Sequence, residues 1–397
     1  MAKLSLADVE VGGKRVLLRV DFNVPLAGGG VADDTRIRAA LPTICHLRAH
    51  GARAVLLSHL GRPKGRPDPA LSLAPVARRL GELLGAEVGF CPHTTGPQAG
   101  RAGADLPPGG VVLLENLRFD PGEEANDPAF AAALAELGEV FVSDAFGTVH
   151  RAHASTVGVA AHFEQAACGF LIARELDFLG RALSDPISPY VAIVGGAKVG
   201  DKIPVIRSLL ARADTLLIGG GMAYTFLKAQ GRAVGNSLLD EPHLQLAGRL
   251  LQEAAGQGKR VLLPQDHLVA ARADAQAPAQ PCGVEIPDGM MGLDIGPETR
   301  QRFAGAIAEA GMIVWNGPMG VFELPRFCEG TFAVARAVAH SAAVSIVGGG
   351  DSVSAVNQAG VAERISHLST GGGATLELLQ GKTLPGIEVL TERPGPA

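Results

Sequence analysis

The chain has 397 residues, 47% of them hydrophobic, so it is long enough and apolar enough for two domains with separate cores. Its net charge of −5 argues against a nucleic-acid partner, because phosphate backbones attract basic surfaces. The cysteines are scattered and form no Cys-x-x-Cys motif, which predicts buried free thiols rather than disulfides or a zinc site: Cys45, Cys91, Cys168, Cys282 and Cys328.

The N-terminus reaches Asp8 without the apolar run of a signal peptide, and no apolar stretch approaches the roughly 18 residues of a membrane helix. We therefore expect a cytoplasmic protein. In the first half of the chain, short apolar runs alternate with amphipathic stretches, which predicts a parallel sheet with helices on both faces. The expected strands are 15–20, 54–58, 111–114 and 139–143, and the expected helices are 35–50 and 72–84, marked by Asp34 and Ser72.

The second half repeats this alternation. Strands are expected at 190–194, 215–218, 260–263, 312–315, 344–347 and 365–368, with a helix at 242–255. A helical stretch at 170–183, which Pro186 and Pro189 end, separates the two halves. Because open parallel sheets bind ligands beyond the carboxyl ends of their strands, the residues that follow each strand are the candidate site residues.

In the first half, the loops after successive strands carry arginine, histidine, aspartate and asparagine. The loops are DFNVP (21–25), SHLGRP (58–63), ENLRF (115–119) and SDAFGTVHRAH (143–153); they hold Asp21, Asn23, His59, Arg62, Arg118 and Arg151, and Arg36 opens the helix after the first of them. A single arginine is most often a surface charge, but clustered guanidiniums repel one another unless an anion lies among them. Because a guanidinium matches phosphate and carboxylate oxygens bidentately, we expect a small dianionic or trianionic ligand.

The histidines give no clear catalytic base. His59 and His150 could act as bases, but a polar contact to the anion is the favoured role. His46 and His50 share one helix face, where a solvated surface is favoured over a metal site because no carboxylate or cysteine completes a ligand set. The absence of an evident base fits an acceptor that is already ionised at neutral pH, such as a carboxylate.

In the second half, glycines follow the strands instead. The strand–glycine–helix units are 191–203, 216–229, 344–356 and 365–379. Glycines let the chain turn tightly and let amide groups approach a phosphate, and the following helix adds its positive dipole end. Tight strand–helix packing would explain one such loop, but the repetition favours phosphate binding by some of them.

The first glycine loop fits neither G-x-G-x-x-G nor the Walker A pattern, since Asp201 separates Gly200 from Lys202. Lys198 and Lys202, spaced i,i+4 at an expected helix start, can neutralise a polyphosphate. Asp351 directly follows GGG, where it either holds a magnesium ion on nucleotide phosphates or caps the next helix. The sequence favours neither role.

Two unlike anion-binding halves predict phosphoryl transfer between separately held ligands, in a cleft between the domains that closes to exclude water. Two alternatives stay open. A nicotinamide-dependent dehydrogenase would require the missing dinucleotide fingerprint. A binding protein that closes on an anion would lack Lys198, Lys202 and Asp351, all of which are present.

Along essentially its whole length the chain resembles the phosphoglycerate kinase family. The motifs that carry the resemblance, in order, are RVDFNVP, DDTRI, SHLGRPKG, ENLRF, SDAFGTVHRAHAST, GGAKVGDKI, LLIGGGMAYTFLKAQG, GLDIGPET, WNGPMGVFE, GGGDS and STGGGATLELLQGKTLPG. The resemblance implies reversible, glycolytic transfer between magnesium-bound ATP and the carboxylate of 3-phosphoglycerate, giving ADP and 1,3-bisphosphoglycerate, by a monomer that closes about a hinge.

The resemblance also implies an α/β fold of two Rossmann-like domains, each a parallel sheet flanked by helices, joined by a hinge helix. The phosphoglycerate-binding domain would span 1–170 with the returning segment 380–397, the inter-domain helix and hinge 171–186, and the nucleotide-binding domain 187–379. The phosphoglycerate would be held by Asp21, Phe22, Asn23, Arg36, His59, Leu60, Gly61, Arg62, Arg118 and Arg151.

The same motifs assign the nucleotide side. Its residues would be Gly196, Ala197, Lys198, Lys202, Gly221, Gly292, Asn316, Glu323, Gly348, Gly349, Gly350, Asp351 and Ser352. Arg36, Lys198 and backbone amides near Gly350 and Gly373 would stabilise the transferring phosphoryl group. Lys202 would bind the nucleotide phosphates, Asp351 would contact the metal and Glu323 the ribose, and Asn316 and Gly292 would line the nucleoside pocket.

Two positions depart from the family pattern, which usually has serine where this chain has Gly200 and Thr375. Thr375 keeps the hydroxyl group. Gly200 loses one at an expected helix start, which puts a minor helix-stabilising or phosphate contact in question but not the activity.

Overall fold

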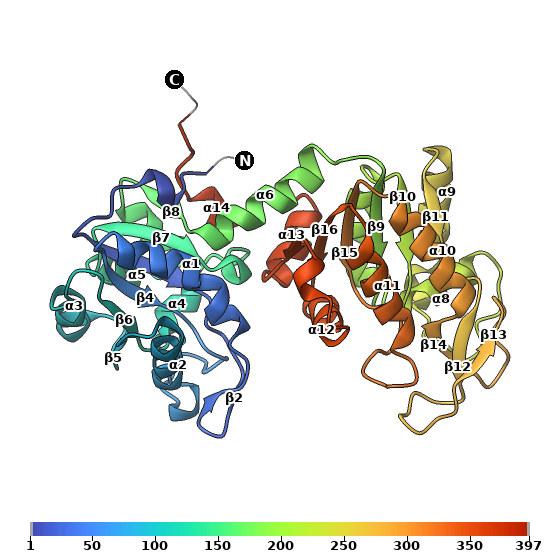
Figure 1. The fold of residues 1–397 in the computed structure, drawn as a ribbon, viewed down its shortest axis with the longest axis horizontal. Helices are drawn as coiled ribbons and strands as arrows, with labels where there is room; N and C mark the ends of the chain where they lie inside the picture. Colours follow the sequence, from blue (N-terminus) through green and yellow to red (C-terminus); the bar gives the residue numbers. More distant parts are fainter. Residues whose placement is uncertain (1–2, 395–397) are drawn as a thin grey trace. The chain divides into compact units, whose positions relative to one another are not determined.

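The computed structural model describes residues 3–394 and divides them into two compact units. One unit contains the residues up to Asp177 and those from Thr383 onward, and the other runs from Phe178 to Lys382. Helix α6 (Phe170–Ser184) carries the chain from the first unit into the second (Figure 1). No helix among the described residues has the length and apolar character that a bilayer crossing requires.

The first unit is built on a six-stranded sheet whose strands are all parallel. Its order is β5 (Gly89–Cys91), β6 (Val111–Leu114), β4 (Arg53–Leu57), β1 (Arg15–Val20), β7 (Val140–Asp144) and β8 (Ala166–Cys168). A small antiparallel hairpin of β2 (Leu26–Ala27) and β3 (Gly30–Val31) projects from the loop after β1. The sheet places the carboxyl ends of β6, β4, β1 and β7 next to one another.

Helices cover both faces of this sheet. They are α1 (Thr35–Ala49), α2 (Ala74–Leu84), α3 (Gly96–Ala104), α4 (Pro121–Ala125), α5 (Pro128–Ala135) and α14 (Pro385–Glu388). Alternate residues of a strand face opposite sides, and Leu18 of β1 packs in one core with Ile44 of α1 and Leu80 of α2. On the other face, Gly103 of α3 lies so close to Val55 that a Cβ there would be 2.9 Å from a Val55 methyl group.

The second unit also has a six-stranded parallel sheet. Its order is β11 (Arg260–Leu262), β10 (Thr215–Ile218), β9 (Tyr190–Val194), β15 (Met312–Asn316), β16 (Val344–Gly348) and β17 (His367–Leu368). An antiparallel sheet of β13 (Gln280–Cys282), β12 (His267–Ala270) and β14 (Met291–Ile295) lies beside it.

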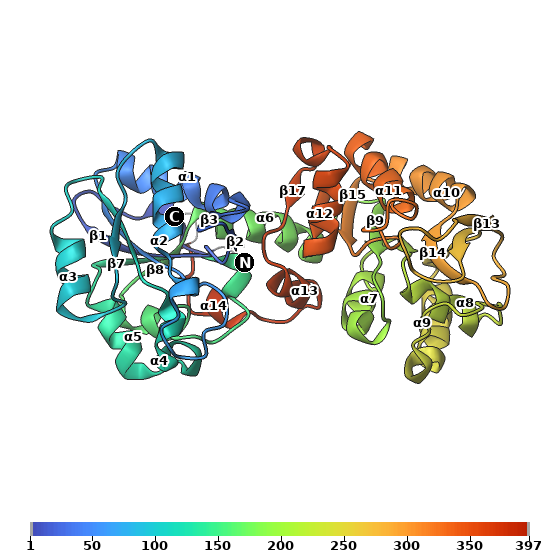
Figure 2. The same cartoon turned by 90° about the horizontal axis from the view of Figure 1, so that it is seen from below.

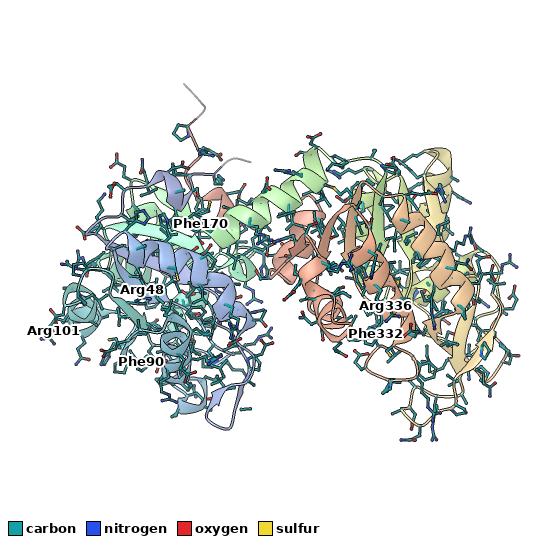
Figure 3. All side chains as sticks on the ribbon, viewed as in Figure 1. Arg48, Phe90, Arg101, Phe170, Phe332 and Arg336 are labelled. Carbon is teal, nitrogen blue, oxygen red and sulfur yellow. The ribbon has the colours of Figure 1, made fainter. Side chains whose placement is uncertain are left out.

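Figure 2 shows the helices of this unit in two groups, α10 to α12 on one side of the parallel sheet and α7 to α9 with α13 on the other. Their bounds are α7 (Ile203–Leu210), α8 (Met222–Ala229), α9 (Leu244–Gly256), α10 (Pro297–Ala308), α11 (Glu329–His340), α12 (Gly350–Gln358) and α13 (Gly373–Leu379). On α11, Val334 and Val338 face the core, whereas the half-buried Phe332 and Arg336 lie on the opposite side of the helix (Figure 3).

The prediction of two parallel sheets, each flanked by helices, is confirmed. The sequence patterns missed the short strands β5 and β8 and the whole antiparallel sheet. The prediction of buried thiols is correct for Cys91 and Cys168 and wrong for Cys45, which is exposed on α1. Cys282 and Cys328 are half-buried, and none of the five forms a disulfide.

The buried imidazole of His267 makes the second unit sensitive to acid. Burial lowers the pKa of His267 to about 4, so the folded protein binds this proton at a lower pH than the unfolded chain does. A depressed histidine pKa contributes stability that is complete above about pH 6.5 and is lost as the pH falls toward 4. Relative to His267→Gln, the wild type should therefore lose roughly 2–3 kcal/mol of unfolding free energy between pH 7 and pH 4. Urea unfolding of both proteins between pH 7 and pH 4 tests this prediction. A difference in unfolding free energy between wild type and His267→Gln that stays the same at every pH would contradict it.

Candidate functional site

In the first unit, the predicted arginine loops follow β1, β4, β6 and β7, which are neighbours in the sheet. The structure therefore brings together most of the predicted residues. Arg36 Nη1 donates to Asp21 Oδ2 at 2.9 Å and to the carbonyl oxygen of Asn23 at 3.2 Å. The side-chain oxygen of Asn23 accepts the amide of Gly61 at 2.9 Å, so the loop after β1 is tied to the loop after β4.

Arg118 ties the loop after β6 into the same cluster, and its buried Nε and Nη2 both lack a hydrogen-bond acceptor among the described residues, although Nε forms an ion pair. Its Nη1 donates to the Gly61 carbonyl oxygen at 2.7 Å, and its Nε lies 3.2 Å from Glu124 Oε1. Only 3% of the side chain is exposed, and Nη2 is buried with no hydrogen-bond acceptor among the described residues. A buried guanidinium nitrogen without an acceptor is costly, so this geometry favours an anion as the missing partner.

The other residues predicted at the carboxyl edge of this sheet differ in their burial and in their hydrogen bonds. Arg151 Nε donates to His150 Nε2 at 3.1 Å. Arg62 is exposed and makes no hydrogen bond or ion pair within residues 3–394, so the structure does not join it to the cluster. Phe22 and Leu60 have buried side chains, and their amides donate to Ser58 Oγ and Asn116 Oδ1, at 2.9 and 3.1 Å.

A buried polar network beneath these loops was missed by the sequence reading. Arg19, in the otherwise apolar β1, is fully buried; its Nε donates to Ser155 Oγ at 2.7 Å and its Nη2 lies 3.2 Å from His59 Nδ1. Ser155 in turn donates from its hydroxyl and its amide to the buried Glu123, at 2.7 and 3.0 Å. The signal was a charged residue inside a buried strand, two positions before Asp21.

His59 is held neutral by its surroundings. Because arginine only donates, the contact with Arg19 makes Nδ1 an acceptor and places the ring hydrogen on Nε2. Burial, with the positive charges of Arg19, Arg118, Arg36 and Arg151, sets the pKa of His59 well below its usual range. A neutral imidazole with a fixed Nε2–H group is a hydrogen-bond donor, which agrees with the predicted polar contact and not with a cationic role.

In the second unit, the predicted glycine loops follow β9, β10, β16 and β17, and the WNGP loop follows β15; these five strands are neighbours. Helix α12 begins at Gly350 after Gly349 at φ 93°, and α13 begins at Gly373 after Gly372 at φ 51°. Both preceding residues lie in the left-handed region that favours glycine. A Cβ on Gly349 would also be 2.8 Å from Asn316 Nδ2, so the glycine permits a close approach of the two loops.

Lys202 and Asn316 link three of these loops. Lys202 Nζ donates to Asn316 Oδ1, and Asn316 Nδ2 donates to the Gly348 carbonyl oxygen at 2.8 Å. Lys198 is exposed. The prediction that both lysines lie on one helix turn is wrong: Gly200–Lys202 form a 3-10 turn, η6, and α7 begins only at Ile203. Pro204 fits the first turn of α7 because it lacks the amide hydrogen that a helix start leaves unbonded.

The structure distinguishes the two roles left open for Asp351, a magnesium ligand or the cap of the next helix. Gly349 occupies the N-cap position of α12, and Asp351 lies within the first turn and makes no capping hydrogen bond. The capping role is therefore wrong. Its exposed carboxylate instead lines a cavity of about 390 Å³, together with other predicted nucleotide residues: Gly196, Ala197, Gly221, Gly292 and Glu323.

Two side chains support this cavity. Tyr224 of α8 lines it and was not predicted; its hydroxyl oxygen would be 2.2 Å from a Cβ on Gly292, which explains the glycine at that position. Ser352, which was predicted, is buried, and its Oγ accepts the Gly317 amide at 2.6 Å, so it orders the loop after β15. Thr375 lies 2.5 Å from Ser369, Oγ1 to Oγ, and its hydroxyl is buried.

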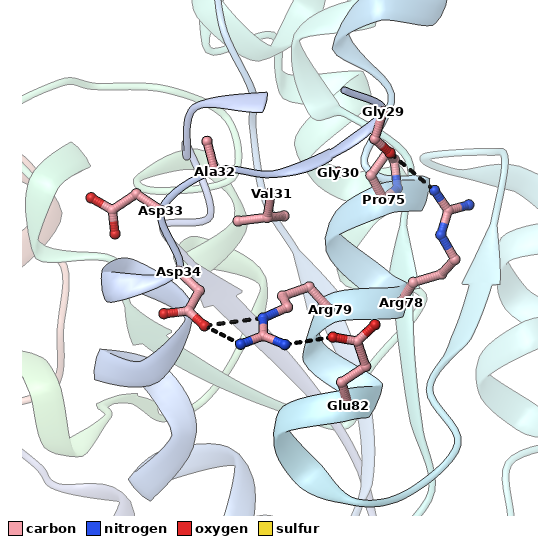
Figure 4. A pocket seen from close by; sticks show the side chains of 10 residues that line it. All are labelled: Gly29, Gly30, Val31, Ala32, Asp33, Asp34, Pro75, Arg78, Arg79 and Glu82. Atoms are coloured by element: carbon pink, nitrogen blue, oxygen red, sulfur yellow. Dashed lines mark hydrogen bonds and ion pairs between the residues drawn. The ribbon is translucent and has the colours of Figure 1, made fainter. Parts of the chain in front are cut away.

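A second cavity, of about 680 Å³, lies in the first unit between the β2–β3 hairpin and α2 (Figure 4). Its charged groups already have partners within the protein, including Asp33, which accepts from Thr35. Arg79 donates to Asp34 Oδ2 at 2.7 Å and to Glu82 Oε2 at 2.5 Å, and Arg78 donates to the Gly29 carbonyl oxygen at 3.4 Å. Nothing in this lining calls for a ligand.

The fold and the two strand-end clusters define an α/β protein with one guanidinium-rich sheet edge and one glycine-rich sheet edge. The family model described as phosphoglycerate kinase matches residues 6–382. A phosphoglycerate kinase of Moorella thermoacetica is 60% identical over 99% of this chain and 100% of its own length, and one of Rubrobacter xylanophilus is 57% identical over 99% of each chain. The solved phosphoglycerate kinase of Coxiella burnetii superposes with a TM-score of 0.90 at 43% identity, over 98% of both chains.

The chain belongs to the phosphoglycerate kinase family, and it is a kinase of glycolysis. Membership removes both alternatives, the dehydrogenase and the non-enzymatic binding protein. The resemblance inferred from the motifs is confirmed.

Proposed function

We propose that the chain transfers a phosphoryl group reversibly between magnesium-bound ATP and the carboxylate of 3-phosphoglycerate, as a cytoplasmic monomer. The observation that carries this proposal is the buried Arg118 Nη2, which has no acceptor in the described part of the chain. It belongs to a cluster in which burial and the positive charges of Arg36, Arg118 and Arg151 lower the pKa of His59 and keep its imidazole neutral. So many guanidiniums around one neutral donor suit a small ligand with both phosphate and carboxylate groups.

On the acid side, Arg118 and Arg151 would neutralise the phosphate, and the Nε2–H group of His59 and the side chain of Asn23 would orient the ligand. The exposed Arg62 would reach the ligand only at its periphery. Arg36, held by Asp21 at 2.9 Å, would face the phosphoryl group in transit. A preorganised cation of this kind stabilises charge that develops in the transition state without reorganising.

On the nucleotide side, the cavity between Gly196, Gly221 and Glu323 would take the nucleoside, and the glycine amides at the starts of α12 and α13 would take the phosphates. Lys198 and Lys202 would neutralise the polyphosphate. The exposed carboxylate of Asp351 has the oxygen donors that magnesium prefers, and the remaining ligands would come from the phosphates and water. The bound metal would reduce the charge on the phosphates during transfer.

The residues supply positioning and charge rather than a proton acceptor. A carboxylate acceptor is ionised at neutral pH, so its attack on the γ-phosphorus needs no base, and the bond to the ADP oxygen breaks as the acyl phosphate forms. Hinge closure, which would exclude water as a competing acceptor, stays a prediction.

A coupled assay with ATP, magnesium and 3-phosphoglycerate tests the proposed activity. We expect ADP to form only when the acid is present, and the reverse reaction to make ATP from 1,3-bisphosphoglycerate and ADP. If purified, folded protein releases no ADP beyond the acid-free control, the proposal fails.

Lys202→Ala is expected to raise the KM for ATP roughly tenfold or more, because a hydrogen bond to a charged group contributes about 1.5–3 kcal/mol. The KM for 3-phosphoglycerate should change less than twofold. Lys228→Ala, which removes an exposed lysine of α8 in the same unit, is the matched control. An unchanged ATP KM in Lys202→Ala would remove the assigned role.

A further inference from the structure

The loop that carries Lys198 and Lys202 is hydrogen-bonded to Asp240, which directly precedes the 3-10 turn η7 (Glu241–His243). Asp240 Oδ2 accepts the amide of Gly200 at 2.9 Å, and its Oδ1 lies 2.8 Å from His243 Nδ1. The backbone of Asp240 is itself fixed, because its amide donates to Thr225 Oγ1 of α8 at 3.0 Å. Asp240 therefore connects three elements: its carboxylate contacts η7 and the first residue of η6, and its backbone amide contacts α8.

The imidazole of His243 lies directly over Gly200. A Cβ on Gly200 would be 2.5 Å from His243 Cε1 and 2.9 Å from Nδ1, closer than real Cβ atoms approach other atoms. The backbone of Gly200 is not in the left-handed region, so the glycine is explained by the ring above it and not by its own conformation. Any side chain at this position would displace His243 from Asp240.

The charges around Asp240 agree with this arrangement. Its side chain is only 11% exposed, and that of His243 is 38% exposed. Desolvation raises the pKa of the Asp240 carboxyl, but the hydrogen bonds from His243 and the Gly200 amide, with the positive charges of His243 and Lys198, hold it below its usual range overall. The carboxylate thus accepts the amide at the start of η6, and the charge of Lys198 adds to the lowering of its pKa.

We propose that Asp240 and His243 form a positioning pair that fixes the loop 196–202 so that Lys198 and Lys202 meet the nucleotide phosphates. The proposal rests on the nucleotide role proposed above for this loop. Neither residue touches the reacting atoms; Asp240 supplies the acceptor that η6 would otherwise lack, and His243 keeps the carboxylate oriented toward Gly200.

The test compares Asp240→Ala, His243→Ala, Gly200→Ala and the double variant Gly200→Ala/His243→Ala in the full chain. We expect Asp240→Ala to raise the KM for ATP about 5- to 30-fold and each of the other single variants about 3- to 10-fold, with the KM for 3-phosphoglycerate within twofold. The double variant should be no worse than the worse single variant, because the added methyl group and the missing ring break the same contact. His340→Ala, which removes an exposed imidazole from α11, should change neither KM.

The outcomes distinguish a failure of the positioning pair from a failure of the nucleotide-binding role proposed for the loop 196–202. If Lys202→Ala raises the ATP KM while Asp240→Ala and His243→Ala leave it within twofold, the positioning pair is refuted and the nucleotide role stands. If Lys202→Ala has no effect, the nucleotide role itself fails. Additive losses in the double variant would also refute the pair. Should Asp240→Ala not fold, the Gly200 and His243 variants decide alone, since they alter only a small methyl group and a partly exposed ring.

Discussion

Arg36→Ala should lower kcat by about 100- to 1,000-fold and leave the KM for ATP within twofold, since loss of one preorganised transition-state donor costs about that much. Arg36 lies in the first turn of α1, and its guanidinium donates to Asp21 and to the Asn23 carbonyl oxygen, both in the loop after β1. All three residues belong to the first unit, whereas the glycine loops after β9, β10, β16 and β17 belong to the second unit. Steady-state kinetics with each substrate varied in turn measures both constants.

Arg38→Ala is the control for this experiment. Arg38 lies two residues further along α1, is more than half exposed and pairs with Asp34 at 2.7 Å. Exposed pairs of this kind contribute little, so its kinetics should match the wild type. A loss of ATP affinity in Arg36→Ala comparable to its loss of turnover would show that Arg36 acts on the nucleotide and not on the transferring group.

Glu123→Ala should destabilise the first unit by about 3–5 kcal/mol, the cost of breaking a buried charge network by removing one partner. Glu123 is fully buried and accepts two hydrogen bonds from Ser155, whose hydroxyl also accepts from Arg19. The substitution would leave the Arg19 guanidinium buried without its compensating carboxylate. Urea unfolding followed by circular dichroism measures the effect.

The adjacent Glu124 provides a matched comparison. Its side chain is half exposed and lies 3.2 Å from Arg118 Nε. Glu124→Ala should cost clearly less stability than Glu123→Ala, because half of the Glu124 side chain is exposed and water can take the place of its carboxylate beside Arg118. Equal losses in the two variants would mean that the network around Arg19 contributes no more than a surface contact.

The sequence predicted the parts of the fold that depend on local pattern. Apolar runs such as 15–20 and 190–194 are typical of strands that helices cover on both faces, and both are strands of the parallel sheets. Because residues after parallel strands meet at one edge, the positions of Arg36, Arg118 and His59 in one cluster also followed from the sequence.

Other features depend on contacts that no local pattern records. The strands β12 to β14 are short and mixed in polarity, and they are stabilised by pairing with one another. Arg19 was hidden because its partners Glu123 and Ser155 are more than 100 residues away in the chain. The i,i+4 spacing of Lys198 and Lys202 suggested one helix face, but Gly200–Lys202 form a 3-10 turn, and the amide of Gly200 donates to Asp240, which lies 40 residues later.

The central claim is that the two anions bind to different units, the acid through guanidiniums and the nucleotide through glycine loops and lysines. Titration calorimetry of Arg118→Ala and Lys202→Ala with each ligand tests it most directly. We predict that Arg118→Ala loses most of its affinity for 3-phosphoglycerate and keeps its affinity for ATP, and that Lys202→Ala does the reverse. If either variant loses affinity for the opposite ligand to the same extent, the division of roles between the units is wrong.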